Sequence, residues 1–210
     1  MRVRLRTSFL LASPTRGASL RQTQWQPHVL ALNPPPPLRA WLTADGSLTA
    51  RLKEHSQTFR VQCLHQRVAR CLSDEAAAIG LHRPGRVWER EVLLRCDNTP
   101  VVFAHTVVPM SATAADWPLF SALGERSLGT TLFGDPRVRR GVLEFARLRE
   151  EHPLAQRAAA ALGLELERPP RERILYARRC LYRRRQGTLL VTEVFLPSVL
   201  DLKQQRSHNE

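Results

Sequence analysis

Residues 88–109 read WEREVLLRCDNTPVVFAHTVVP, and this stretch decides the fold. Apolar residues dominate both halves, and the turn formers Asp97-Asn98-Thr99-Pro100 separate them. The pattern predicts a β-hairpin with strands from Val87 to Cys96 and from Val101 to Val108. Side chains alternate across a strand, so Arg90 lies in the middle of an apolar face. That face carries Trp88, Arg90, Val92 and Leu94.

A second hairpin is expected near the end of the chain. Its strands run from Arg173 to Arg184 and from Thr188 to Leu196, around a turn at Gln186-Gly187. Glu193 lies inside an apolar run of the second strand, on the same face as Leu189, Val191 and Phe195.

The turn length sets which arginine shares the face of Glu193. If Gln186-Gly187 is a two-residue turn, Cys180 faces Glu193 and Arg178 lies on the Glu193 face. A three-residue turn would place Arg179 there instead. We expect Arg178.

The rest of the folded part supplies one more strand and several short helices. Thr58 to Val68 alternates as a strand. Asp135-Pro136 predicts the start of a helix that continues through Val138, Val142, Phe145 and Arg149. Other helices are expected at Leu38–Leu42, Leu48–His55 after an Ser47 cap, Ser73–Ile79 before Gly80, and Leu154–Leu162. These elements predict an α+β domain on a mostly antiparallel sheet.

The 210 residues fit one domain with tails. Residues 1–37 are basic and rich in proline, so we expect a disordered or poorly ordered tail, although the first part also resembles a transit peptide. Pro34 to Pro37 is a stiff spacer that marks the boundary. The folded domain then covers 38–202, and the polar residues 203–210 form a C-terminal tail.

Composition excludes several classes of protein. No apolar run approaches the roughly 20 residues that span a bilayer, so no stable membrane insertion is expected. The four cysteines form no C-x-x-C pair, which excludes zinc ribbons and suits the reducing cytoplasm. The net charge is +13, but of the 32 basic residues only Lys53 and Lys203 are lysines, which indicates a coding bias. We therefore expect no nucleic-acid partner.

Two buried charges carry the candidate chemistry. A guanidinium at Arg90 needs an anion, which is either an internal carboxylate or a bound ligand carboxylate. Glu193 is either a core acid paired with an arginine or a carboxylate that meets a ligand hydroxyl. With a second arginine beside them, they would suit a small dianionic ligand that bears a hydroxyl. The glycines at 124, 129 and 134 match no nucleotide-binding loop, and the histidines offer no metal pair at helical spacing.

Four motifs, in this order, resemble the chorismate pyruvate-lyase family. They are W-x-R-E-[IV]-L-L at Trp88–Leu94, T-V-V-P at Thr106–Pro109, L-G-x-x-x-L-G-x-x-L-F at Leu123–Phe133, and L-L-x-T-E-x-F-L-P at Leu189–Pro197. The resemblance covers roughly Trp41 to Leu202, and together the motifs are highly specific.

The resemblance implies a six-stranded antiparallel sheet with helices over it, and a ligand sealed beneath helical flaps. It implies conversion of chorismate to 4-hydroxybenzoate and pyruvate for ubiquinone synthesis, with no metal or organic cofactor. It assigns Arg90 to a substrate carboxylate, Glu193 to the aromatic hydroxyl, and backbone contacts to Leu48 and Leu128. The arginine pair Arg178-Arg179 would supply the group for the enolpyruvyl carboxylate.

Three positions depart from the family pattern. Leu48 stands where the family has methionine, which a backbone contact tolerates. His105 stands where it has arginine, with consequences for the flaps and for product affinity, although the residues alone indicate a core or surface histidine. Residues 150–171 resemble an insertion relative to compact members of the family, and we expect them to lengthen a helix over the sheet.

Two other functions share the expected fold or ligand. A non-catalytic ligand-sensing domain of GntR-type regulators would need an N-terminal winged helix, for which the residues before Trp41 are too few and too rich in proline. A catalytically inactive ligand carrier is disfavoured by the presence of both Arg90 and Glu193. A monomer is expected.

Overall fold

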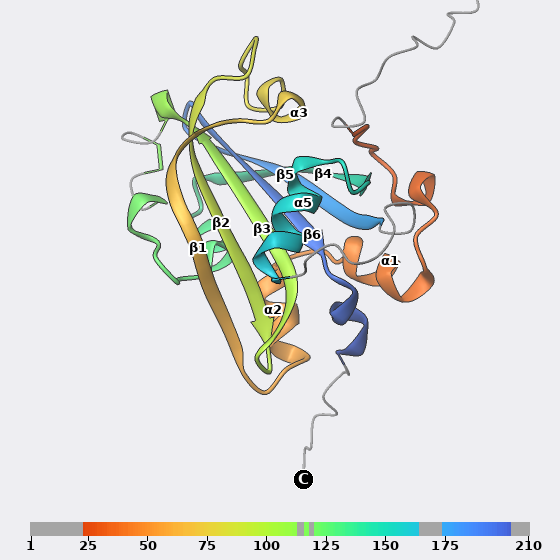
Figure 1. The fold of residues 1–210 in the computed structure, drawn as a ribbon. Coiled ribbons are helices and arrows are strands. Elements are labelled where there is room, and N and C mark those ends of the chain that lie inside the picture. Colours follow the sequence, from red (N-terminus) through yellow and green to blue (C-terminus); the bar gives the residue numbers. More distant parts are fainter. Residues whose placement is uncertain (1–22, 113–115, 118–119, 164–173, 203–210) are drawn as a thin grey trace, which may run out of the picture.

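The computed structural model describes residues 23–112, 116–117, 120–163 and 174–202. They form a six-stranded, fully antiparallel sheet in the order β1-β2-β3-β6-β5-β4 (Figure 1). The strands are β1 (Phe59–Arg70), β2 (Arg86–Cys96), β3 (Thr99–Pro109), β4 (Val138–Leu148), β5 (Leu175–Arg184) and β6 (Gly187–Phe195). The expected fold class is confirmed.

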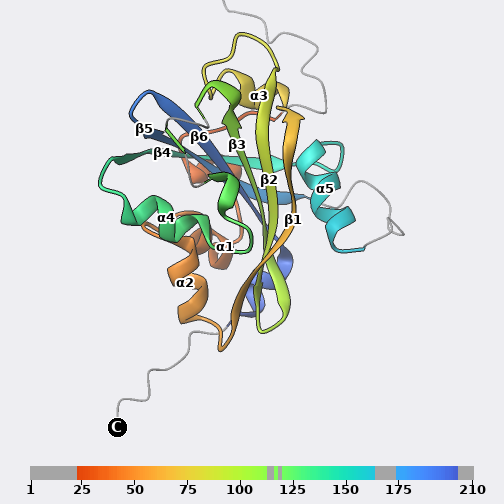
Figure 2. The same ribbon diagram turned by 90° about the vertical axis from the view of Figure 1, so that its left-hand side faces the viewer.

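Helices cover both faces of this sheet. Figure 2 shows α2 and α4 on one face and α5 on the other, with α3 at one end of the strands. The helices are α1 (Pro36–Leu42), α2 (Leu48–Glu54), α3 (Ser73–Ala76), α4 (Leu128–Gly134) and α5 (Pro153–Ala161). Short 3-10 turns lie at Val29–Leu32, Met110–Ala112, Phe120–Ala122 and Pro197–Asp201. No helix among the described residues is long and apolar enough to cross a membrane.

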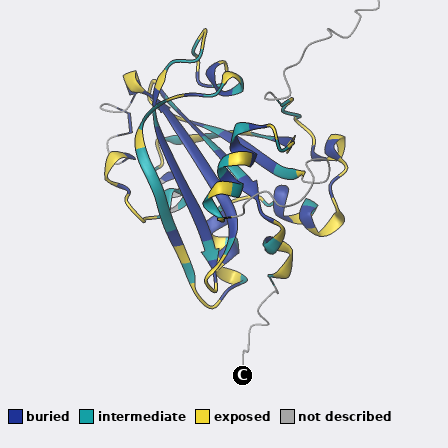
Figure 3. Cartoon of the chain, in the orientation of Figure 1, coloured by how far each residue is buried: buried dark blue, intermediate teal, exposed yellow. Residues whose placement is uncertain are grey.

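The first hairpin forms where it was predicted, but its turn has two residues in place of four and β3 begins at Thr99. Cys96 pairs with Thr99, and the intervening Asp97 and Asn98 have φ values of 48° and 64°, which short polar side chains tolerate. Its strands occupy the middle of the sheet and are buried on both faces (Figure 3). Because α2 and α4 cover one face and α5 the other, polar residues in the middle of these strands, such as Glu89 and Thr106, are buried, whereas Arg86 and Thr99 at the strand ends are exposed.

The prediction of a helix after Asp135-Pro136 is wrong. That segment is a turn followed by strand β4, which pairs with β5. The register shifts by one residue between Arg140 and Leu143, and Val142 points out to solvent at 80% exposure. After such an extra residue, the side chains that face inward change from odd-numbered to even-numbered positions, or the reverse. The interrupted alternation therefore imitates helical spacing.

The turn of the last hairpin lies one residue earlier than predicted. Arg184 pairs with Gly187, so the turn is Arg185-Gln186, and Arg185 adopts a φ of 53°. Glycine is needed in the strand instead, because a Cβ on Gly187 would lie 2.7 Å from Asp116 Oδ2. The error in register is two residues, so the faces of the strand are unchanged.

The folded domain begins before Leu38. Gln26 exchanges backbone hydrogen bonds of 2.8 Å with Phe145 of β4, and Val29 and Leu32 are buried in the core. Pro36 begins α1, so the proline run opens a helix where a spacer was expected. Residues 1–22 and the expected C-terminal tail at 203–210 lie outside the described part of the chain.

The other short helices follow their predicted signals. Ser47 caps α2, and its Oγ accepts a hydrogen bond of 3.3 Å from the Ala50 N–H. Helix α3 is shorter than the predicted Ser73–Ile79, because it ends at Ala76 and a turn leads from there to Gly80, which has a φ of 80°. Helix α5 lies within the segment 150–171 that was expected to be an insertion, and it packs on the face of the sheet away from α2 (Figure 2).

Candidate functional site

A small cavity lies between the middle of the sheet and helices α2 and α4. Its volume is about 50 Å³. The floor comes from β1, β2, β3 and β6, and the roof from α2, α4 and the residue before α4. Most of the lining is apolar. The polar side chains in it are those of Thr49, Arg90, Thr106, Ser127 and Glu193.

Arg90 is buried at 2% exposure in the wall of this cavity. Its Nη2 donates hydrogen bonds to the carbonyls of Gly124 at 2.8 Å and Arg126 at 3.0 Å. Its Nε has no hydrogen-bond partner among the described residues. Burial lowers the pKa of the Arg90 guanidinium, a sign that the cation is poorly solvated.

The two alternatives for Arg90 can now be compared. Within the described residues, none of the ion pairs includes Arg90. An internal carboxylate partner is therefore absent from that part of the chain. A cation that is buried beside a cavity and has no carboxylate partner attracts an anionic ligand.

Glu193 reaches the same cavity from β6, with its side chain 20% exposed. It stands opposite Arg178 of β5, whose Nε donates to Glu193 Oε2 at 2.5 Å. The prediction that Arg178 shares the face of Glu193 is confirmed, although Arg178 lies directly opposite Glu193 where Cys180 was expected. Glu193 is thus paired with an arginine, as the first alternative expected, and it also lines the cavity; its contact with a ligand hydroxyl stays a prediction.

The expected second cation is not in the cavity lining. Arg178 lies behind Glu193 and does not line the cavity. Arg179 points to the opposite face of the sheet, where its Nε donates to Glu144 Oε2 at 2.8 Å. Among the described lining residues, Arg90 is the single cation.

The roof is built where α2 and α4 meet. Leu48 and Leu128, the positions assigned to backbone contacts by resemblance, both line the cavity. The hydroxyls of Thr49 and Ser127 are 2.7 Å apart and join the two helices. Gly129 allows this approach, because a Cβ there would lie 3.2 Å from Thr49 Oγ1.

Sequence reasoning missed three polar residues of the cavity: Thr49, Thr106 and Ser127. Thr106 stands opposite Arg90 in the hairpin register, so the alternation of β3 could have found it. Thr49 and Ser127 come from segments that meet only in the folded chain, and the sequence carries no signal for that contact.

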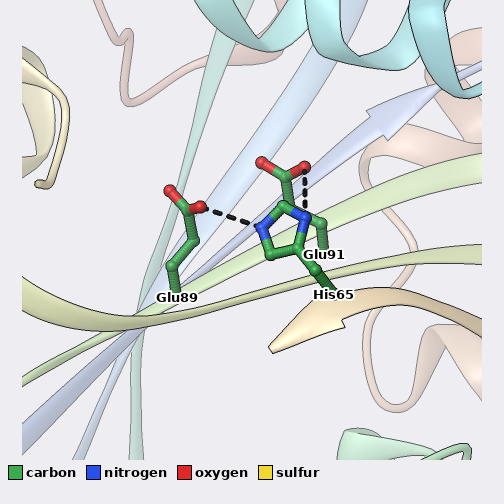
Figure 4. A group of neighbouring side chains, drawn as sticks. All are labelled: His65, Glu89 and Glu91. Atoms are coloured by element: carbon green, nitrogen blue, oxygen red, sulfur yellow. Dashed lines mark hydrogen bonds and ion pairs between the residues drawn. The ribbon is translucent and has the colours of Figure 1, made fainter. Parts of the chain in front are cut away.

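A second group of buried charges lies on the other face of β2. Glu89 and Glu91 flank Arg90 in sequence and point away from the cavity, toward His65 of β1 (Figure 4). These three residues offer ligand atoms within 4.8 Å of one another, a spacing that could hold a metal ion. However, Arg157 Nη1 of α5 already donates to Glu89 Oε2 at 2.8 Å and to Glu91 Oε1 at 2.7 Å. The group is therefore an internal ionic network.

His105 belongs to this network and not to the cavity. It is fully buried, with Nδ1 3.1 Å from Glu91 Oε1 and Nε2 2.9 Å from Glu75 Oε1. Burial acts to lower the pKa of His105, but the two carboxylates outweigh it and raise the pKa to about 10. Burial likewise opposes the charge of Glu91, yet His105 and Arg157 lower its pKa to about 2. His105 is thus a core histidine on the far side of the sheet from α2 and α4.

Fold and cavity together define an α+β protein with a small cavity on one face of an antiparallel sheet, lined by a buried arginine and a glutamate. The sequence profile of the family described as chorismate lyase matches residues 19–205. The chain belongs to the chorismate lyase family, which is a family of lyases.

Curated relatives agree with this assignment. A protein of Cupriavidus metallidurans is 51% identical over 162 residues, which cover 77% of this chain and 74% of that protein. One of Ralstonia nicotianae is 51% identical over 160 residues, covering 76% and 80%. Both carry the name "Probable chorismate pyruvate-lyase".

Solved structures also match, at low sequence identity. The effector domain of PhnF from Mycobacterium smegmatis has a TM-score of 0.48 at 16% identity, covering 73% of this chain and 90% of that chain. A GntR-family transcriptional regulator from Bacillus cereus has a TM-score of 0.49 at 10% identity, covering 71% and 99%.

Proposed function

We propose that this chain converts chorismate to 4-hydroxybenzoate and pyruvate, as a step toward ubiquinone. The observation that carries the proposal is the buried Arg90 guanidinium, which has no carboxylate partner among the described residues and lines the same cavity as Glu193. The names of the relatives at 51% identity support the same reaction.

Arg90 is proposed to bind the ring carboxylate of the substrate. Its Nη2 is held by two loop carbonyls, while its Nε is left for a ligand oxygen. In a water-poor cavity this charged hydrogen bond is stronger than it would be at the surface. Thr106 stands opposite Arg90 on β3 and adds a hydroxyl to the same part of the wall.

Glu193 is proposed to accept a hydrogen bond from the ring hydroxyl. The reaction breaks the bond between the ring and the enolpyruvyl oxygen, and removes the hydrogen from the ring carbon that bears the hydroxyl. The ring becomes aromatic, and the released enolpyruvyl group takes up the proton to become pyruvate. Glu193 is the single carboxylate among the described lining residues, so it either orients the hydroxyl or relays that proton.

Much of the catalysis comes from positioning. Aromatisation supplies the driving force, so the chain has to hold the carboxylates, fix the ring and exclude water. The cavity of about 50 Å³ is smaller than the roughly 300–1,000 Å³ of ordinary ligand pockets. The roof of α2 and α4 must therefore move apart to admit a ring with two carboxylates.

The setting of this reaction is also part of the proposal. The substrate and product are small carboxylates, and the chain acts on them as a monomer. All four cysteines are free thiols, which fits a cytoplasmic location.

The test is to mix the purified protein with chorismate and follow both products. Equal amounts of 4-hydroxybenzoate and pyruvate support the proposal. Binding of 4-hydroxybenzoate without turnover would favour a non-catalytic carrier or sensor. The absence of both turnover and binding would refute the proposed function outright.

A further inference from the structure

Arg178 occupies an unusual position behind the cavity wall. It is 2% exposed, and its guanidinium is bonded on two sides. Nε donates to Glu193 Oε2 at 2.5 Å. Nη1 donates to the carbonyls of Ala44 at 2.9 Å and Leu42 at 3.2 Å, with Trp41 further away at 3.4 Å. One side chain thus connects the cavity acid to the segment between α1 and α2.

The carbonyls that Arg178 binds belong to the end of α1 and the loop after it. Carbonyls at a helix C-terminus lack partners within the helix, and a buried cation satisfies them well. That loop leads directly to Ser47, which caps α2. Arg178 therefore binds the segment that leads into α2, and we call this segment, from Leu42 to Ser47, the foot of α2.

The pairing also fixes which oxygen of Glu193 is available. Oε2 is held by Arg178, and within the described part of the chain no donor reaches Oε1. A carboxylate held on one side by a planar guanidinium loses rotational freedom, so its second oxygen keeps one direction. The ring of Phe195 packs against the guanidinium of Arg178, with Arg178 Cζ 5.7 Å from the ring centre.

We propose that Arg178 is a positioning residue, which holds Glu193 in its working orientation and sets it relative to the foot of α2. This inference rests on the proposed function, because it assigns Arg178 a role in the reaction that Glu193 serves. Arg178 acts through Glu193 and does not itself bind substrate.

Arg179 provides a matched control. It is the next residue of the same strand, is 8% exposed, and pairs through Nε with a carboxylate, Glu144, at 2.8 Å. Its side chain lies on the opposite face, where it also donates to the Asp74 carbonyl and stacks on Trp25. Loss of either arginine removes an ion pair of a buried arginine, but only Arg178 is connected to the cavity.

The experiment is a double-mutant cycle of Arg178→Met with Glu193→Gln, beside a control cycle of Arg179→Met with Glu144→Gln. Arg178→Met and Glu193→Gln should each lower kcat at least about tenfold, and the double variant should be no worse than Glu193→Gln within about twofold. KM should change little, because Arg90 holds the ring carboxylate. The control cycle should lower the thermal midpoint and leave kcat unchanged.

Arg178→Lys covers the case in which Arg178→Met does not fold. An ammonium cannot hold Glu193 and the Ala44 carbonyl together as the guanidinium does, so kcat should recover only in part. Independent, multiplicative losses from Arg178 and Glu193 would overturn the positioning role while wild-type turnover stood. A wild-type chain that binds 4-hydroxybenzoate without turnover refutes the proposed function. In that case the coupling between Arg178 and Glu193 is measured with the same variants from the dissociation constant of 4-hydroxybenzoate.

Discussion

Arg90 and Glu193 line one cavity from opposite sides of strand β3. Arg90 pairs across from Thr106, and Glu193 pairs across from Ala104. Since Ala104 and Thr106 are two residues apart on one strand, they share a face, and so do their partners. A cation and an acid that are far apart in sequence are thereby placed on one wall.

Replacing Arg90 should abolish most of the activity. Arg90→Ala is expected to lower kcat/KM for chorismate at least about 100-fold, because loss of one partner of a desolvated charge pair costs about 2–5 kcal/mol. Steady-state kinetics measures the loss, and a thermal melt separates it from unfolding. Arg86→Ala, an exposed arginine on the same strand, is the control and should be near wild type. Near-wild-type kcat/KM in Arg90→Ala would contradict the assignment.

The hydroxyl bridge between α2 and α4 should control product release. Thr49→Val removes one end of the 2.7 Å contact with Ser127 while it keeps the side-chain shape. Loss of one hydrogen bond of about 0.5–1.5 kcal/mol should speed dissociation of 4-hydroxybenzoate about two- to tenfold. Stopped-flow dissociation measures this, with Thr43→Val at the exposed end of α1 as the control. An unchanged dissociation rate would mean that the roof opens elsewhere.

The stability of the protein should fall as the pH rises above 6.5. The pKa of His105 is raised from 6.5 to about 10, so its protonation stabilises the folded chain fully below pH 6.5. That contribution is lost between pH 6.5 and about 10. The carboxylates of Glu75 and Glu91 face the His105 ring. Glu91 is also paired with Arg157 and His65.

His105→Gln isolates this effect. Its free energy of unfolding should be lower than that of the wild type at pH 6.5, and the difference should shrink toward pH 10. Urea unfolding at intervals across this range measures both curves. Parallel curves for the two proteins would show that His105 does not change its protonation on folding.

Gly187 should resist substitution for a steric reason. A Cβ there would lie 2.7 Å from Asp116 Oδ2, and β6 cannot shift without disturbing its pairs on both sides. Gly187→Ala is expected to destabilise the fold by about 1–3 kcal/mol in urea unfolding. Gly134→Ala is the matched control, since its Cβ would meet open space. Equal stability of the two variants would count against close packing at Gly187.

Much of the site could be predicted from the sequence, because strand alternation is a local property. The alternation of β2 places Arg90 on the cavity face and Glu89 and Glu91 on the other. The face of Arg178 was also correct despite a wrong turn, since an error of two residues leaves strand parity unchanged. The prediction of a helix at β4 was wrong because the register shift in this strand interrupts the two-residue alternation of its side chains.

Other properties depend on contacts that no local pattern contains. Whether Arg178 meets a ligand or Glu193 depends on the pairing of β5 with β6 and on the loop after α1. Whether Arg90 has an internal carboxylate depends on everything packed around it. The sequence and its local spacing thus determined which charged and apolar residues share one face of a strand. Only the tertiary structure decided which charges are partnered and which is left facing the cavity, because pairing is set by contacts between segments distant in the chain.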